Sequence, residues 1–104
     1  MKKRYIVKES KDFEKIIKEG ICKKNRSFVI YTLKNNQKYN RYGISVGKKI
    51  GNAVIRNKYK RKIRHIIDNY KKSYVNNSDY IIILRKGALD KNYQELANEY
   101  IKLV

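Results

Sequence analysis

The stretch Gly51–Tyr70, GNAVIRNKYKRKIRHIIDNY, decides the fold of this chain. Between Arg56 and Arg64 it carries six Lys and Arg residues, yet its apolar residues recur at the 3.6-residue period of an α-helix. That period gathers one set of residues into an arc of about 120°: Ile55, Tyr59, Ile63, Ile66, Ile67 and Tyr70. We therefore predict a helix that packs this arc against a core, with Asn52 as its N-cap and Arg56 at the boundary of the basic remainder.

The charge of the whole chain favours a polyanionic partner. Its 104 residues include 27 Lys and Arg but only 9 Asp and Glu, giving a net charge of +18 that repels itself. Cations on a helix are often merely solvated, but no acidic residue compensates this run before Asp68. An anionic membrane is the weaker alternative, because the chain has no Trp and needs its apolar residues for a core. The distribution of charge thus predicts a nucleic-acid partner.

The rest of the chain predicts the elements around that helix. They are a helix at Lys11–Glu19 capped by Ser10, two neighbouring antiparallel strands at Ser27–Leu33 and Tyr42–Val46, a strand at Asp79–Leu84 covered on both faces, and a last helix capped by Asp90. This order favours a single domain over residues 1–104, an α+β fold in which three helices pack on a small mixed sheet as a two-layer sandwich. A crossover through the basic helix would make the strands before and after it parallel.

Aromatic residues on the predicted strands suggest a second contact with nucleic acid. Strand alternation puts Tyr31 on one face with Val29 and Leu33, while Phe28 and Ile30 point to the other. Aromatic residues on strands near basic loops are typical of surfaces that stack single-stranded bases, although packing in a core explains either ring as well. A helix-turn-helix fits poorly, because strand patterns flank the basic helix on both sides.

No constellation of residues indicates an autonomous enzyme. The acidic residues are scattered singly, whereas a nuclease needs converging carboxylates or a pair of acid-base groups. His65 is the only His and is expected to face solvent, and Cys22 is the only Cys, so neither has a partner for a metal site. The lack of a possible intramolecular disulfide and of any long apolar stretch predicts a soluble cytoplasmic protein. We expect a binding protein that holds no metal or cofactor of its own.

The segment RYGISVGKKIGNAVIRNKYKRKIR, Arg41–Arg64, closely resembles the signature of the bacterial ribonuclease P protein subunit. The resemblance extends upstream to NRSFVIYTL, downstream to DYIIILRKG, and to a first helix that carries a Phe. It implies a ribosomal protein S5 domain 2-like fold, with a further short strand near Ile21–Lys24 and a left-handed βαβ crossover that breaks the general rule. It also implies that a catalytic RNA cleaves the 5′ leader from precursor tRNA, while the small basic protein binds both RNAs.

The same resemblance implies two RNA-binding surfaces. The residues that match the arginine-rich helix near the catalytic RNA are Arg56, Asn57, Lys58, Lys60, Arg61 and Arg64. Those that match a cleft for the unpaired leader are Phe13, Ile17 and Tyr31 on its floor and Lys48, Lys49, Arg85 and Lys86 at its edges. The chain departs from the family at three positions. Ile17 stands where a second aromatic is usual, Lys58 replaces an Arg and lacks its planar fork, and His65 stands where Glu or Gln is common.

The mechanism implied is assistance by the protein and catalysis by the RNA. The protein would hold the leader and neutralise phosphates, while Mg²⁺ held mainly by the RNA activates the attacking water, and no protein partner is required. Two rival functions remain open: a ribosomal or RNA-chaperone protein that uses the same helix, and an autonomous RNA nuclease.

Overall fold

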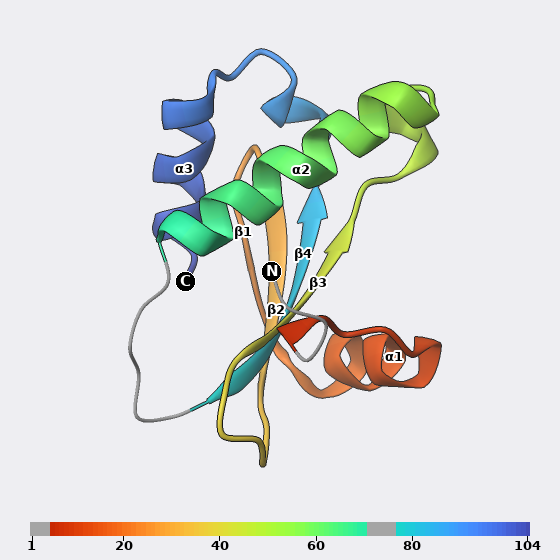
Figure 1. The fold of residues 1–104 in the computed structure, drawn as a ribbon, viewed down its shortest axis with the longest axis vertical. Coiled ribbons are helices and arrows are strands. Elements are labelled where there is room, and N and C mark those ends of the chain that lie inside the picture. Colours follow the sequence, from red (N-terminus) through yellow and green to blue (C-terminus); the bar gives the residue numbers. More distant parts are fainter. Residues whose placement is uncertain (1–4, 71–76) are drawn as a thin grey trace.

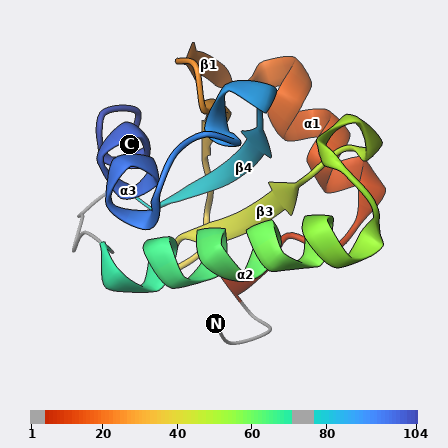
Figure 2. The ribbon, with the colours of Figure 1, turned by 90° about the horizontal axis from the view of Figure 1, so that it is seen from above.

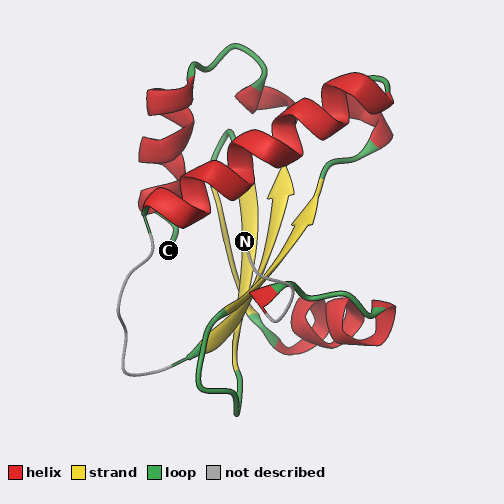
Figure 3. Cartoon of the chain, viewed as in Figure 1, coloured by secondary structure: helices red, strands yellow, loops and turns green. Residues whose placement is uncertain are grey.

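A computed structural model describes residues 5–70 and 77–104 (Figure 1, Figure 3). Its elements in chain order are α1 (Ser10–Glu19), β1 (Ile21–Lys24), β2 (Phe28–Lys34), β3 (Arg41–Ser45), the 3-10 turn η2 (Lys48–Ile50), α2 (Ala53–Asn69), β4 (Ser78–Leu84), the 3-10 turn η3 (Lys86–Ala88) and α3 (Tyr93–Ile101). The predicted order is confirmed, and so is the short strand that the resemblance implied at Ile21–Lys24. None of the described helices is long and apolar enough to span a membrane.

The four strands form one mixed sheet in the order β1-β2-β4-β3. The prediction that β2 and β3 are neighbours is therefore wrong, because β4 lies between them and pairs with both. The β1–β2 and β2–β4 pairs are antiparallel, whereas β3 and β4 are parallel and joined through α2. In Figure 1 both parallel strands point upward with β4 to the left of β3, and α2 passes in front of the sheet. Figure 2 confirms from above that α2 lies on that side. The crossover is therefore left-handed, as the resemblance implied and against the general preference.

Helices lie on both sides of the sheet. On one side α2 and α3 pack on Phe28, Ile30, Ile82 and Leu84, and the buried residues that α2 contributes are Ile63, Ile66 and Ile67. On the other side α1 inserts Ile16 beside Val7 and Ile81. β4 lies between two strands and is buried on both faces, as the near-continuous apolar run of Asp79–Leu84 predicted.

An ion pair ties α1 to the sheet. Arg41 of β3 donates from Nε and Nη2 to the two carboxylate oxygens of Asp79 on β4, at 2.8 and 2.6 Å, and Asp79 is 5% exposed. Asn35 donates a further bond of 2.7 Å to the same carboxylate, and Asp12 of α1 lies 3.9 Å from the guanidinium. The hydrogen bonds to Asp79 raise the pKa of Arg41 above its ordinary value. Asp12 thus links the first turn of α1 to the Arg41–Asp79 pair of β3 and β4.

Three details of the predicted helices are wrong. Ile55 is 39% exposed and outside the core, because the first turn of α2 projects past the sheet (Figure 1). Its side chain packs back on Gly51. Ser10 is the first residue of α1 and does not cap it. The cap of α3 is Asn92, two residues after Asp90, because its side chain and that of Glu95 form a reciprocal capping box. The predicted cap of α2 is confirmed, since the Asn52 side chain accepts a hydrogen bond from the Ile55 N–H.

Candidate nucleic-acid interface

The basic side of α2 gathers most of the predicted cations in one place. A shallow hollow, which we call the α2 hollow, is lined by Val54, Asn57, Lys60, Arg61 and Arg64. These positions repeat at helical intervals of three and four, so their side chains form one stripe on the surface of α2. The structure thus brings together four of the six residues predicted for this surface, all except Arg56 and Lys58.

The remaining polar residues of α2 have different surroundings. Arg56 is half-buried at the boundary, as predicted, while Lys58 is exposed outside the hollow. Lys62 lies 5.2 Å from the centre of the Tyr59 ring, which favours a cation–π contact. His65 is exposed, as predicted, but its Nδ1 lies 2.9 Å from the Tyr93 hydroxyl, and this contact joins α2 to α3.

The opposite side of the sheet carries the aromatic residues. The ring of Phe13 lies directly over Gly43, since a Cβ on that glycine would be 2.6 Å from Phe13 Cζ and 2.8 Å from Ile81 Cδ1. Only glycine permits this approach of α1 to β3. Phe13 and Tyr31 are half-buried in the same cluster, whereas Ile17, one turn further along α1, is 40% exposed and outside it.

Tyr31 forms part of a surface that α1 covers only in part. We call this surface the open face. It consists of half-buried or exposed residues from β1, β2 and β4, namely Cys22, Val29, Tyr31 and Ile83. Cys22 is the partner of Tyr31 in the register of β1 and β2, and a hydrogen bond between the two side chains raises the pKa of the tyrosine. Sequence patterning missed Val29 and Ile83, because apolar strand residues are ordinarily assigned to the core.

Basic residues border the open face at one edge of the sheet. Because β3 and β4 are parallel, with Ser45 opposite Ile83, the segments that follow them leave from the same edge. Lys48 and Lys49 lie on η2 after β3, while Arg85 and Lys86 follow β4, and all four are exposed.

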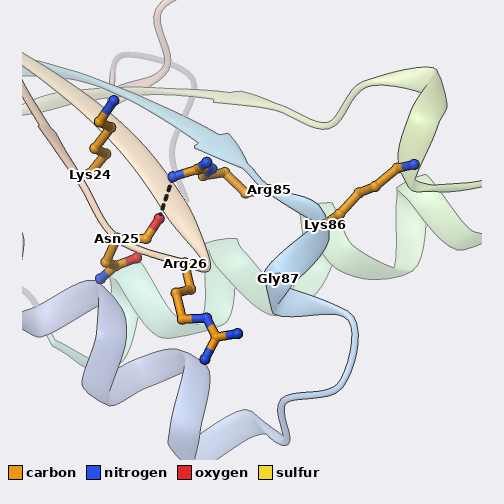
Figure 4. A pocket seen from close by; sticks show the side chains of 6 residues that line it. All are labelled: Lys24, Asn25, Arg26, Arg85, Lys86 and Gly87. Atoms are coloured by element: carbon orange, nitrogen blue, oxygen red, sulfur yellow. Dashed lines mark hydrogen bonds between the residues drawn. The ribbon is translucent and has the colours of Figure 1, made fainter.

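A second group of residues joins these cations at the turn between β1 and β2. Figure 4 shows the pocket there, which we call the hairpin notch, lined by Lys24, Asn25, Arg26, Arg85, Lys86 and Gly87. The Arg85 guanidinium donates a 2.8 Å hydrogen bond to the Asn25 carbonyl and so bridges the two segments. The sequence predicted only Arg85 and Lys86 here, since no linear pattern indicates that residues 24–26 lie beside residues 85–87.

Comparisons with known proteins agree with this architecture. The family model described as Ribonuclease P matches residues 1–104. The ribonuclease P protein component of Streptococcus pneumoniae is 47% identical over 104 residues, which cover 100% of this chain and 85% of that protein.

Solved structures of the same family superpose closely. The RNase P protein from Thermotoga maritima is 31% identical with a TM-score of 0.84, covering 92% of this chain and 91% of that one. A Staphylococcus aureus RNase P protein, described as a mutant with defective mRNA degradation activity, is 41% identical with a TM-score of 0.88, covering 97% and 86%. By the family model, the sequence relatives and the fold, this chain belongs to the ribonuclease P protein family.

Proposed function

We propose that this protein assists the removal of the 5′ leader from precursor tRNA by binding two RNAs on opposite sides of one sheet. The α2 hollow would take the catalytic RNA of ribonuclease P, and the open face with its basic edge would take the leader. The observation that carries the proposal is the separation of the two surfaces, since α2 and α1 lie on opposite sides of the sheet in Figure 2. Each surface can then hold its RNA without displacing the other.

The α2 hollow suits a folded RNA backbone. Lys60, Arg61 and Arg64 project from one rigid helix, so their charges have a fixed spacing against phosphates. Val54 is 76% exposed at the same place and offers an apolar contact to a ribose or base. Arg56 and Lys58 would meet the same RNA outside the hollow.

The open face suits an unpaired strand. Tyr31 presents an aromatic surface on which a base can stack, and Phe13 borders it from α1. Ile17 offers apolar contact only, because it has no ring. Lys48, Lys49, Arg85 and Lys86 would neutralise the phosphates along the edge, which binds single strands with little demand on sequence.

The chemistry of cleavage belongs to the RNA in this proposal. Among residues 5–70 and 77–104 no group of three or more His, Cys, Asp or Glu side chains could hold a metal ion. The proposal assigns the donor set for Mg²⁺ mainly to the RNA. Mg²⁺ bound there would activate the attacking water. The protein's residues would position the leader and neutralise charge. The proposal places the protein in the reducing cytoplasm, with which the free Cys22 is compatible.

The test is single-turnover cleavage of precursor tRNA by a bacterial ribonuclease P RNA at low Mg²⁺, with and without the protein. We expect acceleration by the protein that disappears when the leader is removed almost completely. Equal rates with and without the protein, together with tight binding to ribosomal RNA fragments, would instead support a ribosomal or chaperone role.

A second candidate function is degradation of mRNA, because the description of the S. aureus structure attributes such an activity to that protein. The same purified protein should be incubated with an mRNA in the absence of ribonuclease P RNA. Cleavage that persists through extensive purification and is lost in Arg61→Ala would support this function. An intact mRNA would exclude it.

A further inference from the structure

The hairpin notch is a rigid structure and its geometry does not depend on a flexible loop. Within the turn, the Asn25 carboxamide oxygen accepts hydrogen bonds from the N–H groups of Ser27 and Phe28 at 3.1 and 3.0 Å. The Asn25 amide group donates to the Glu99 carbonyl of α3 at 2.9 Å, which fixes the turn against that helix. A Cβ at Gly87 would overlap the Arg26 carbonyl oxygen, so the two segments touch where glycine alone permits it.

The notch concentrates positive charge, and one carboxylate oxygen of Glu99 on α3 lies 3.4 Å from the Asn25 amide group that lines it. It is lined by Lys24, Arg26, Arg85 and Lys86, and in the described part of the chain none of them has a carboxylate within ion-pair distance. Figure 4 shows Lys24 and Arg26 on opposite sides of the turn, with Arg85 between the two segments. Lys86 points away from the turn in the same view. An excess of positive charge at one end of the sheet favours the binding of an anion there.

The notch is continuous with the open face. Lys24 pairs with Val29 in the β1–β2 register, just as Cys22 pairs with Tyr31, so side chains two residues apart on each strand share that face. Arg85 follows Ile83 by two residues at the end of β4. A strand that crosses Tyr31 and continues toward this end therefore meets Lys24 and Arg85 first, and Arg26 beyond the turn.

We propose that the hairpin notch binds backbone phosphates of the distal part of the leader, those nucleotides that lie beyond the bases placed over Tyr31. This inference rests on the proposed function, because the strand must enter over the open face. Lys24 and Arg26 become leader-binding residues, and Asn25 and Gly87 hold them in place. The ligand is a single-stranded RNA backbone, recognised by charge and not by sequence.

The test compares precursor tRNAs whose leaders have about 4 and about 12 nucleotides, within the range of single-strand site sizes. The holoenzyme is assembled with Lys24→Ala/Arg26→Ala protein, and dissociation constants are measured at several salt concentrations. A matched control, Lys34→Ala/Lys38→Ala, removes the same charge at the opposite end of β2 and in the loop that follows it. Binding without one of these contacts releases about 0.7 fewer counterions. Relative to the affinity at 1 M salt, the affinity at 0.1 M salt then falls by about fivefold for one lost contact and by about 25-fold for two.

We expect this loss for the long leader alone, with a salt slope shallower by about 1.4, while the short leader and the control variant behave as wild type. An unchanged affinity for the long leader would overturn the inference. So would an equal loss for both leaders or for mature tRNA, which would assign the notch to the catalytic RNA or the tRNA body. If Lys24→Ala/Arg26→Ala fails to fold, Lys24→Gln/Arg26→Gln keeps the side-chain length and decides the same question. Failure of the proposed function looks different, because the wild-type holoenzyme would then show no preference for any leader over mature tRNA.

Discussion

Replacing Arg61 with Ala removes one of the charges that line the α2 hollow. Arg61 is exposed and lies between Asn57 and Arg64 on the same stripe. The substitution places a good helix former on a helix surface, so the fold should be unaffected. Any change in RNA binding then reports the lost contact itself.

The magnitude follows from counterion release. Three cations line the hollow, and each phosphate that one of them neutralises releases about 0.7 to 0.9 counterions. The slope of log K against log salt for binding the catalytic RNA should therefore become shallower by about 0.8 in Arg61→Ala. Between 1 M and 0.1 M salt this difference corresponds to an approximately sixfold loss of affinity at the lower concentration.

The assay is equilibrium binding of the protein to ribonuclease P RNA, followed by fluorescence anisotropy over a series of potassium concentrations. Arg61→Lys keeps the charge and should keep the slope, although it loses the planar fork. Lys38→Ala, in the loop between β2 and β3, is the matched control for net charge and should also keep the slope. If Arg61→Ala has the wild-type slope, Arg61 makes no phosphate contact and the assignment of the α2 hollow is refuted.

Three further predictions concern the open face and the packing behind it. Tyr31→Ala should weaken holoenzyme binding of precursor tRNA by about tenfold, as expected for one lost base stack, and leave mature tRNA unaffected; equal losses in the two titrations would remove Tyr31 from the leader site. Arg41→Ala leaves the buried Asp79 carboxylate without its charged partner, and should lower the free energy of unfolding by about 3 kcal/mol and the midpoint by roughly 15 °C in thermal denaturation; a shift of only a few degrees would show that the pair is of little structural importance. Gly43→Ala places a methyl group 2.6 Å from the aromatic ring of α1, and should cost about 1 to 3 kcal/mol in urea denaturation and weaken leader binding as well; a fully stable variant would mean that α1 can move freely.

The sequence predicted those parts of the fold that produce a periodic pattern. The buried side of α2 and the positions of the longer strands along the chain follow from the spacing of apolar residues. In each element the residues that face the core recur at the period of that element. β1 has no such pattern, since all of Ile21–Lys24 is exposed, and only the family resemblance indicated it. The hand of the crossover is likewise a property of the assembled chain that no local pattern contains.

The candidate site could be predicted only where its residues are close in sequence. The α2 hollow is a single stripe on one helix, so helical spacing sufficed to find most of it. The hairpin notch combines residues about 60 positions apart, which meet because β1 and β2 form a hairpin and β4 pairs with β2. To predict such a site, one must know the order of the strands in the sheet, and neither composition nor charge determines that order.

The strands themselves connect the two proposed RNA surfaces. Successive residues of a strand point to opposite faces, so Ile30 and Ile82 join the core beneath α2 while Tyr31 and Ile83 lie on the other side. A slip of one residue in the pairing of β2 with β4 would exchange the two sets, and the loss of core burial forbids it. The position of Tyr31 relative to the basic helix is thus fixed by the same packing that stabilises the fold. A leader held over Tyr31 would then have a fixed offset from an RNA bound to α2, and much of the entropic cost of bringing the two RNAs together would be met when the protein folds.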